Sequence, residues 1–227
     1  MMKRILPLLI AASLLLGGCR KSTSTPATPS PRIVSHSPAI TDLLYGMELG
    51  DHVVGVTNYC MPPGDSKPAV VGDRINVSAE AILAVKPDFV LIQQDPKAFG
   101  AVTAIRPDLR IEHMTIETLD DVAAAMDRIG EITGKSELTG RHRQAFTDKL
   151  QAVREKVAGL ETPSVLLVGG YEHPFTGGKG TFVDEMIAIA GGLNAASLKG
   201  YSNWPSLNRE NIQAMKPEVL ICQVSPG

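Results

Sequence analysis

Two stretches of the chain share one order of apolar and polar positions. Residues 80–93 read Glu-Ala-Ile-Leu-Ala-Val-Lys-Pro-Asp-Phe-Val-Leu-Ile-Gln, and residues 210–223 read Glu-Asn-Ile-Gln-Ala-Met-Lys-Pro-Glu-Val-Leu-Ile-Cys-Gln. In each copy we expect a short helix that ends before the proline, because a residue preceding proline is pushed out of the helical region. The apolar runs at 89–92 and 219–222 have the length of a buried strand. A repeat at this distance predicts two similar lobes.

The segments around each copy alternate between strand-like and helix-like patterns. Such alternation predicts a mostly parallel sheet covered on both faces, so the predicted fold class is α/β with two small lobes. In the first lobe we expect strands at 32–35, 53–56, 88–92 and 110–113, and helices at 39–49, 78–85 and from Pro96. In the second lobe we expect strands at 164–168, 193–196 and 218–223, and helices at 181–190 and 208–215.

A helical connection is expected to join the two lobes. Residues 119–132 have helical periodicity, and residues 135–160 carry a narrow apolar stripe with charged residues on the other faces. A helix over 135–160 would be about 39 Å long, which suits a strut that lies along both lobes. The predicted division is therefore a first lobe at 32–117, a helical connection at 118–161 and a second lobe at 162–227. The second lobe is expected to be incomplete, because symmetry with the first predicts a further helix and strand.

The N-terminus has the features of a bacterial lipoprotein signal. Lys3 and Arg4 precede an apolar segment at 5–16 that is too short to cross a bilayer. The following Leu-Gly-Gly-Cys resembles a lipobox and predicts a signal peptide at 1–18 with a lipid on Cys19; an ordinary signal peptide with a chance cysteine is the alternative. Residues 19–31 are rich in Ser, Thr and Pro and predict a tether. The protein is then anchored by lipid on the periplasmic or extracytoplasmic face.

Composition excludes several classes of protein. A formal net charge of −2 argues against a nucleic-acid partner, which would require a clustered basic face. The sequence has no Cys-x-x-Cys or His-rich spacing that would predict a structural metal site. It also has no arrangement of nucleophile and base that would predict an enzyme. Cys60 and Cys222 fall in different lobes; two free thiols are favoured, although an exported protein could form a disulfide. His36 and His173 follow strands and are weak ligand candidates.

Aromatic residues are scarce, at 4%, and five of them fall in predicted loops. In open parallel sheets, ligands bind at the carboxyl ends of the strands. These loop aromatics either line a cleft between the lobes or pack their own loops, and both readings remain open. The five residues are Tyr59, Tyr171, Phe175, Tyr201 and Trp204.

Glu80 and Glu210 occupy the first turns of the two repeated helices. An acidic side chain at this position is favoured by the helix dipole, by about 0.3–1 kcal/mol. The alternative is functional, because two equivalent exposed carboxylates, one per lobe, could bind basic residues of a partner. The residues alone leave both interpretations open.

Several motifs together resemble one family. These are residues 35–42 (Ser-His-Ser-Pro-Ala-Ile-Thr-Asp), 54–60 (Val-Gly-Val-Thr-Asn-Tyr-Cys), 80–88 and 174–179 (Pro-Phe-Thr-Gly-Gly-Lys), with Trp204-Pro205 and Arg209-Glu210. Over residues 32–227 the chain resembles the class III, single-helix-linked periplasmic solute-binding proteins of ABC importers, which deliver vitamin B12, iron-siderophores or haem. Residues 54–60 and Trp204-Pro205 are most similar to the B12-binding branch.

The resemblance implies a function and a set of site residues. A corrinoid would be held between the lobes by Tyr59, Phe175 and Trp204, with Arg74 as a candidate contact to an anionic or amide group. Haem or a ferric siderophore is the alternative ligand, and a two-lobed α/β enzyme is a less favoured reading. The resemblance implies no resident cofactor, because such ligands bring their own cobalt or iron.

The resemblance also implies the partners. Glu80 and Glu210 would pair with arginines of an ABC permease dimer, which works with its ATPase. The protein itself would be a monomer. Family members continue for some tens of residues beyond the position of the last residue here, which again predicts an incomplete second lobe.

Overall fold

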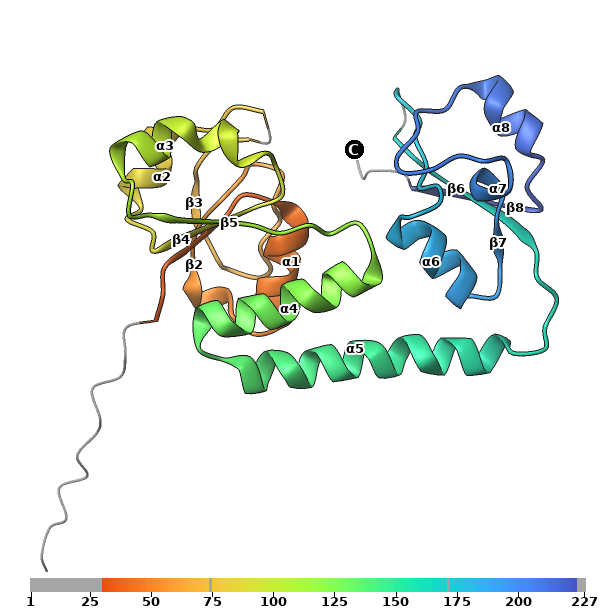
Figure 1. The fold of residues 1–227 in the computed structure, drawn as a ribbon, viewed down its shortest axis with the longest axis horizontal. Coiled ribbons are helices and arrows are strands. Elements are labelled where there is room, and N and C mark those ends of the chain that lie inside the picture. The colour runs from red at the N-terminus through yellow and green to blue at the C-terminus, as the bar shows by residue number, and fades with distance from the viewer. Residues whose placement is uncertain (1–29, 74, 171, 224–227) are drawn as a thin grey trace, which may run out of the picture.

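The computed structural model describes residues 30–73, 75–170 and 172–223. They form two α/β lobes joined by one long helix, α5 (Ser136–Val157), which runs beneath both lobes in Figure 1. The predicted fold class is confirmed. No helix in these residues is both long and apolar enough to span a bilayer.

The first lobe contains a five-stranded parallel sheet in the order β3-β2-β1-β4-β5. Its helices are connected to the strands in the alternation that the sequence predicted. The strands are β1 (Ile33–Ser35), β2 (Val53–Val56), β3 (Ala69–Val70), β4 (Phe89–Ile92) and β5 (Arg110–His113). The helical elements are α1 (Pro38–Gly46), η1 (Gly50–His52), α2 (Ala79–Ala84), η2 (Pro96–Phe99) and α3 (Gly100–Ile105).

Strand β4 shows how this sheet is buried on both faces. Successive side chains of a strand point to opposite faces, so Phe89 and Leu91 enter one core while Val90 and Ile92 enter another. The first core also contains residues of α1 and α4 (Leu119–Thr133), and the second contains residues of α2 and α3. This two-sided burial explains why β4 is a continuous apolar run.

The end of helix α1 differs from the prediction of a helix over 39–49. The helix ends at Gly46, Glu48 adopts a left-handed φ of 62°, and η1 follows. Gly50 does not terminate the helix. It accommodates Tyr45 instead, because a Cβ at Gly50 would lie 2.6 Å from the Tyr45 ring. The predicted long loop after β2 also contains β3, which pairs with β2.

The second lobe has a three-stranded parallel sheet in the order β7-β6-β8. Its core is smaller than that of the first lobe, and the apolar side chains of β8 are 40–51% exposed from Val219 to Ile221. The predicted strand at 193–196 is wrong in its second half, because Asn194 accepts a hydrogen bond from Ala196 N and starts a helix. The elements are β6 (Ser164–Gly169), α6 (Phe182–Ile189), β7 (Leu193–Asn194), α7 (Ala195–Leu198), α8 (Arg209–Met215) and β8 (Val219–Gln223).

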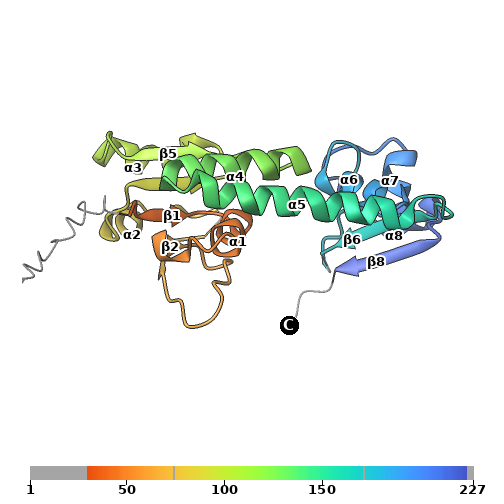
Figure 2. The same cartoon turned by 90° about the horizontal axis from the view of Figure 1, so that it is seen from below.

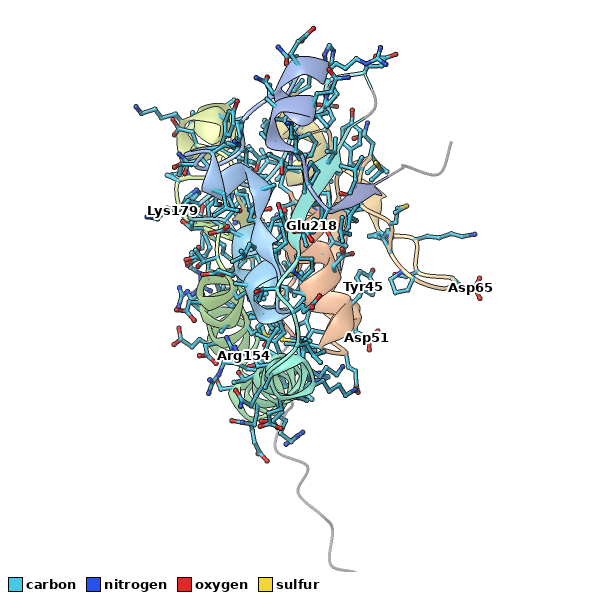
Figure 3. All side chains as sticks on the ribbon, turned by 90° about the vertical axis from the view of Figure 1, so that its right-hand side faces the viewer. Tyr45, Asp51, Asp65, Arg154, Lys179 and Glu218 are labelled. Atoms are coloured by element: carbon cyan, nitrogen blue, oxygen red, sulfur yellow. The ribbon has the colours of Figure 1, made fainter. Side chains whose placement is uncertain are left out.

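The sequence repeat corresponds to a repeated local structure. Lys86 and Lys216 both leave their helices in the left-handed region, at φ 47° and 46°. Asp88 then accepts a hydrogen bond from Arg32 N at 2.8 Å, and Glu218 accepts one from Ser164 N at 3.0 Å. Glu218 is labelled in Figure 3. Each acidic residue thus ties a repeated strand to the start of the neighbouring first strand of its lobe.

The connection between the lobes is a hairpin of two helices, α4 and α5. Thr118 and Asp121 form a capping box at the start of α4, and Gly134 ends it at a φ of 67°. Helix α5 is shorter than the predicted 135–160, because Ala158 is extended, and its length is about 33 Å. Only Thr139 of α5 is fully buried, so most of this helix lies at the surface.

Gly130 is expected to be the residue that fixes the contact between α4 and α5. A Cβ at Gly130 would overlap Thr139 Oγ1 and lie 2.9 Å from Ser136 Cα, so Gly130→Ala should destabilise the protein by about 1–3 kcal/mol through overpacking. Gly140→Ala is the matched control, since nothing lies within 4 Å of its Cβ position. The control should stabilise by about 0.5–1 kcal/mol, because alanine favours a helix. Urea unfolding measures both; two changes of the same sign would contradict this packing.

Candidate functional site

The carboxyl ends of the two sheets face the middle of the molecule. In Figure 2, β1 runs toward the centre from one side, and the arrowheads of β6 and β8 point toward it from the other. In parallel sheets this end carries the loops that bind ligands. The candidate site is therefore built from the loops that follow β2, β4 and β6 and from the loop that precedes α8.

In the second lobe, two of these loops pair with each other. Phe175 exchanges two backbone hydrogen bonds with Gly169 at 2.9 Å, and Gly178 N donates to Asn203 O at 2.8 Å. A Cβ at Gly178 would lie 2.5 Å from Tyr201 O, so this close approach requires glycine. The adjacent Lys179 is exposed at the side of the lobe (Figure 3). The pairing makes loops 174–180 and 201–207 one rigid unit.

This unit carries an aromatic cluster of Phe175, Phe182 and Trp204. The Phe175 and Trp204 rings lie 6.3 Å apart at 65°, and Phe182 lies 5.1 Å from Trp204. Phe175 packs over Gly169, where a Cβ would lie 2.7 Å from its ring, and keeps 37% of its surface exposed. The structure thus brings together two of the four aromatics predicted as ligand contacts, Phe175 and Trp204.

Trp204 also has a polar partner that the sequence did not indicate. Its Nε1 donates to Glu117 Oε2 at 2.6 Å. Glu117 belongs to the segment between β5 and α4, on the other side of the connection. Because the indole N–H of Trp204 is already bonded, a ligand at this cluster would meet the apolar part of the half-buried Trp204 ring.

In the first lobe, Tyr59 extends from a loop that is fixed underneath. Cys60 is buried, and its Sγ accepts from Thr41 Oγ1 at 3.1 Å and lies 3.2 Å from Thr57 Oγ1. Tyr59 itself is 65% exposed and forms no ring pair with the aromatic cluster of the second lobe. The structure therefore places Tyr59 on the opposite lobe without bringing it into contact with Phe175 or Trp204.

His36 lies buried below the carboxyl ends of β1 and β4. Gln94 Nε2 donates to its Nδ1 at 2.6 Å, and the edge of its ring contacts Phe99 at 5.1 Å. Its Nε2 has no partner among the described residues. Burial lowers the pKa of His36 and outweighs the opposing effect of the negative charge of Asp73. His36 thus supports the loops from inside, while His173 is exposed.

Acidification is expected to destabilise the fold through His36. Because burial lowers the folded pKa of His36, the unfolded chain takes up a proton first, near its ordinary pKa of 6.5. Neutral His36 therefore contributes its full stabilisation of the folded state above pH 6.5. This contribution is lost as the pH falls from 6.5 toward the lower pKa of His36 in the folded protein. His36→Gln should therefore flatten the dependence of Tm on pH between about 7 and 5. Exposed His173→Gln is the control; equal slopes for parent and His36→Gln would contradict the role of His36.

Glu80 and Glu210 occupy equivalent positions in the two lobes. Glu80 lies in the first turn of α2, capped by Ser78, and Glu210 lies in the first turn of α8, capped by Asn208. Both are exposed, and neither forms an ion pair with another described residue. Helices α2 and α8 lie on the same side of the molecule, away from α5 (Figure 1). Two carboxylates are thus available on one side, one from each lobe.

Three predicted site residues, Arg74, Tyr171 and Cys19, lie outside the described residues. The remaining cysteines are both free: Cys60 is buried and Cys222 is exposed. This agrees with the favoured interpretation of two free thiols. Within the described part of the chain, no group of three or more His, Cys, Asp or Glu residues could hold a metal ion.

Comparison with known proteins defines the class. The model of the periplasmic binding protein family matches residues 33–225, so the chain belongs to this family. It is 26% identical over 221 residues to a vitamin B12-binding protein of Yersinia pestis (strain Pestoides F), covering 96% of this chain and 77% of that one. The predicted family is therefore confirmed. The relatives and solved structures that resemble this chain are substrate-binding proteins and not enzymes.

Solved structures give the same fold. The periplasmic heme-binding protein RhuT of Roseiflexus sp. RS-1 has a TM-score of 0.73 and 27% identity, covering 85% of this chain and 76% of that one. The periplasmic vitamin B12 binding protein BtuF of Vibrio cholerae has a TM-score of 0.72 and 22% identity, covering 86% and 76%. This fold is therefore shared by proteins that bind different ligands.

Proposed function

We propose that this protein is the substrate-binding component of an ABC importer and captures a corrinoid between its lobes. The observation that carries the proposal is the pair of exposed Phe175 and half-buried Trp204 on one loop unit, with exposed Tyr59 on the other lobe. A large, flat macrocycle gains from contact with such rings. The similarity to a vitamin B12-binding protein supports the same ligand class.

Charge favours a neutral ligand over an anionic one. Within loops 57–61, 174–180 and 201–207, Lys179 is the one basic residue. A strongly anionic ferric siderophore would be poorly compensated there, because charges removed from water require partners. Haem is the second candidate ligand, since the similar RhuT structure is that of a heme-binding protein. Arg74 and Tyr171 stay candidate contacts from the sequence.

The partners follow from the same class. Exposed Glu80 and Glu210 would dock onto basic residues of a permease dimer, whose ATPase drives import. A lipid on Cys19 and the tether at 19–31 would hold the protein on the extracytoplasmic face of the membrane. In this proposal the domain division is 32–117, 118–161 and 162–227, with α5 as the mechanical link.

Titration of the purified protein with cobalamin tests the ligand assignment. The chain has one tryptophan, so quenching of its fluorescence reports on the candidate site. We expect saturable quenching with a Kd of micromolar or below, which haem and a ferric siderophore displace only at higher concentrations. Tighter binding of haem would replace the corrinoid assignment. A folded protein that shows neither quenching nor heat up to high micromolar cobalamin would refute it.

A further inference from the structure

Among the described residues, three hydrogen bonds join the two lobes at one seam, which residues 117–119 form with the start of α6 and with Trp204. Phe182 N donates to Glu117 O at 2.5 Å, and Leu119 N donates to Glu185 Oε2 at 2.6 Å. Trp204 Nε1 donates to Glu117 Oε2 at 2.6 Å. Glu117 thus uses both its backbone and its side chain to hold the second lobe.

The backbone part of this seam is reciprocal. Leu119 is the first residue of α4 and Phe182 is the first residue of α6. The first N–H groups of a helix have no partner within it. Here each of these two N–H groups is satisfied by the other lobe, through Glu185 for α4 and the Glu117 carbonyl for α6. Opening the seam would leave two helix ends without these partners.

The backbone of Glu117 is also held by hydrogen bonds within the N-terminal cap of α4. Asp121 Oδ2 accepts hydrogen bonds from Glu117 N at 3.0 Å and from Thr118 N at 2.9 Å. The Glu117 backbone is therefore part of the capping structure of α4, and only its side chain reaches Trp204. A side chain on a fixed backbone can position its partner.

An open pocket lies beside this seam. Helices α4, α5 and α6 line it, with Phe146, Leu150 and Ile189 among its walls, and its volume is about 510 Å³. The three hydrogen bonds therefore lie next to a solvent-accessible space between these helices. Removing these hydrogen bonds should therefore change the relative arrangement of the lobes and increase the local motion of the Trp204 side chain.

We infer that Glu117 is a positioning residue that fixes the Trp204 indole and holds the two lobes in their relative arrangement. The effect on ligand affinity rests on the proposed function, whereas the effects on Trp204 and on the lobes do not. With its N–H held by Glu117, the indole cannot turn its polar edge into the site. Ligand binding then avoids the entropy cost of ordering this ring.

The first test uses the ligand-free protein and the variants Glu117→Ala and Glu117→Gln. Time-resolved anisotropy of the single tryptophan should show faster local motion in Glu117→Ala, while Glu117→Gln, which keeps an oxygen acceptor, should retain most of the parental restraint. Glu161→Ala, at an exposed acid between α5 and β6, is the charge control. Parental anisotropy in Glu117→Ala would overturn the positioning of Trp204.

The second test measures the lobes directly. Spin labels on Ala104→Cys in α3 and Ala214→Cys in α8, in a Cys222→Ser background, report the distance between the lobes. Glu117→Ala and Glu185→Ala should each broaden the distance distribution, and their combination should broaden it further, whereas Glu161→Ala should not. Unchanged distributions in all three seam variants would overturn the role in holding the lobes.

The third measurement is the Kd for cobalamin. It should rise about tenfold in Glu117→Ala, which corresponds to a loss of about 1.4 kcal/mol of binding free energy. The rise should be smaller in Glu117→Gln. A parent that fails to bind cobalamin would refute the proposed ligand, while the anisotropy and distance results would still decide the role of Glu117. Altered anisotropy with an unchanged Kd would overturn the link between Trp204 positioning and binding.

Discussion

Replacement of both Glu80 and Glu210 by arginine is expected to abolish ligand uptake while leaving the ligand affinity of the purified protein within about twofold. Both side chains are exposed in the first turns of capped helices, so each change should cost only about 0.3–1 kcal/mol of stability. In a docked complex, loss of one partner of a buried charge pair costs about 2–5 kcal/mol, and reversal adds repulsion. Two reversed sites should therefore reduce permease binding by several orders of magnitude.

Uptake into membrane vesicles that contain the permease and ATPase measures this effect, alongside cobalamin binding by the purified variants. Asp51→Arg with Glu161→Arg is the matched control, since it reverses one exposed acid in the first lobe and one at the end of the connection next to the second lobe, and it changes the net charge equally. Asp51 is labelled in Figure 3. Each single variant should keep part of the uptake. Parental uptake by the Glu80 and Glu210 double variant, or an equal loss in the control, would contradict docking through these carboxylates.

The second large effect is expected at the aromatic cluster. Trp204→Ala and Phe175→Ala should each lower cobalamin affinity by about 30-fold, since truncation of a central aromatic contact costs about 2 kcal/mol. Because the two rings contact each other, their effects should not add fully, and the double variant should lose roughly 100-fold. Tyr59→Ala should weaken binding from the other lobe by a smaller factor, since Tyr59 pairs with no other ring among the described residues.

Calorimetric titration is the appropriate measurement, because Trp204→Ala removes the fluorescence signal. Leu198→Ala is the control, as it removes a large apolar side chain that is 62% exposed in the same lobe. Circular dichroism and Tm establish that each variant is folded. Full affinity in a folded double variant of Phe175 and Trp204 would show that the ligand binds elsewhere.

Much of the fold follows from local sequence signals. The repeated Lys-Pro-Asp/Glu segments predicted both helix ends and both strands, because proline restricts the residue before it. In each copy the acidic side chain ties two strands together. The expected burial is confirmed for β4 but is wrong for β8, because β8 is an edge strand of the described sheet and its apolar side chains are 40–51% exposed from Val219 to Ile221. The end of α1 was misplaced for a different reason. Gly50 was read as a helix terminator, but its small size serves the packing of Tyr45, which is a tertiary effect.

The candidate site was only partly accessible from sequence. Loop position after strands indicated Phe175 and Trp204, and the structure shows their rings in contact. Glu117 could not be found in this way, because it lies 87 positions from Trp204 and meets it only through the tertiary arrangement of the two lobes. One weak signal was its place directly before the capping residue Thr118. The buried state of His36 likewise depends on Phe99 and Gln94, which come from a later part of the lobe.

The most direct test of the central claim, that one ligand is held by both lobes, is hydrogen–deuterium exchange with and without one equivalent of cobalamin. We predict slower exchange in the same complex at residues 57–61 of the first lobe and at 174–180 and 201–207 of the second, with α5 unchanged along its exposed middle. Protection confined to one lobe, or a saturated complex without protection in these loops, would contradict binding between the lobes.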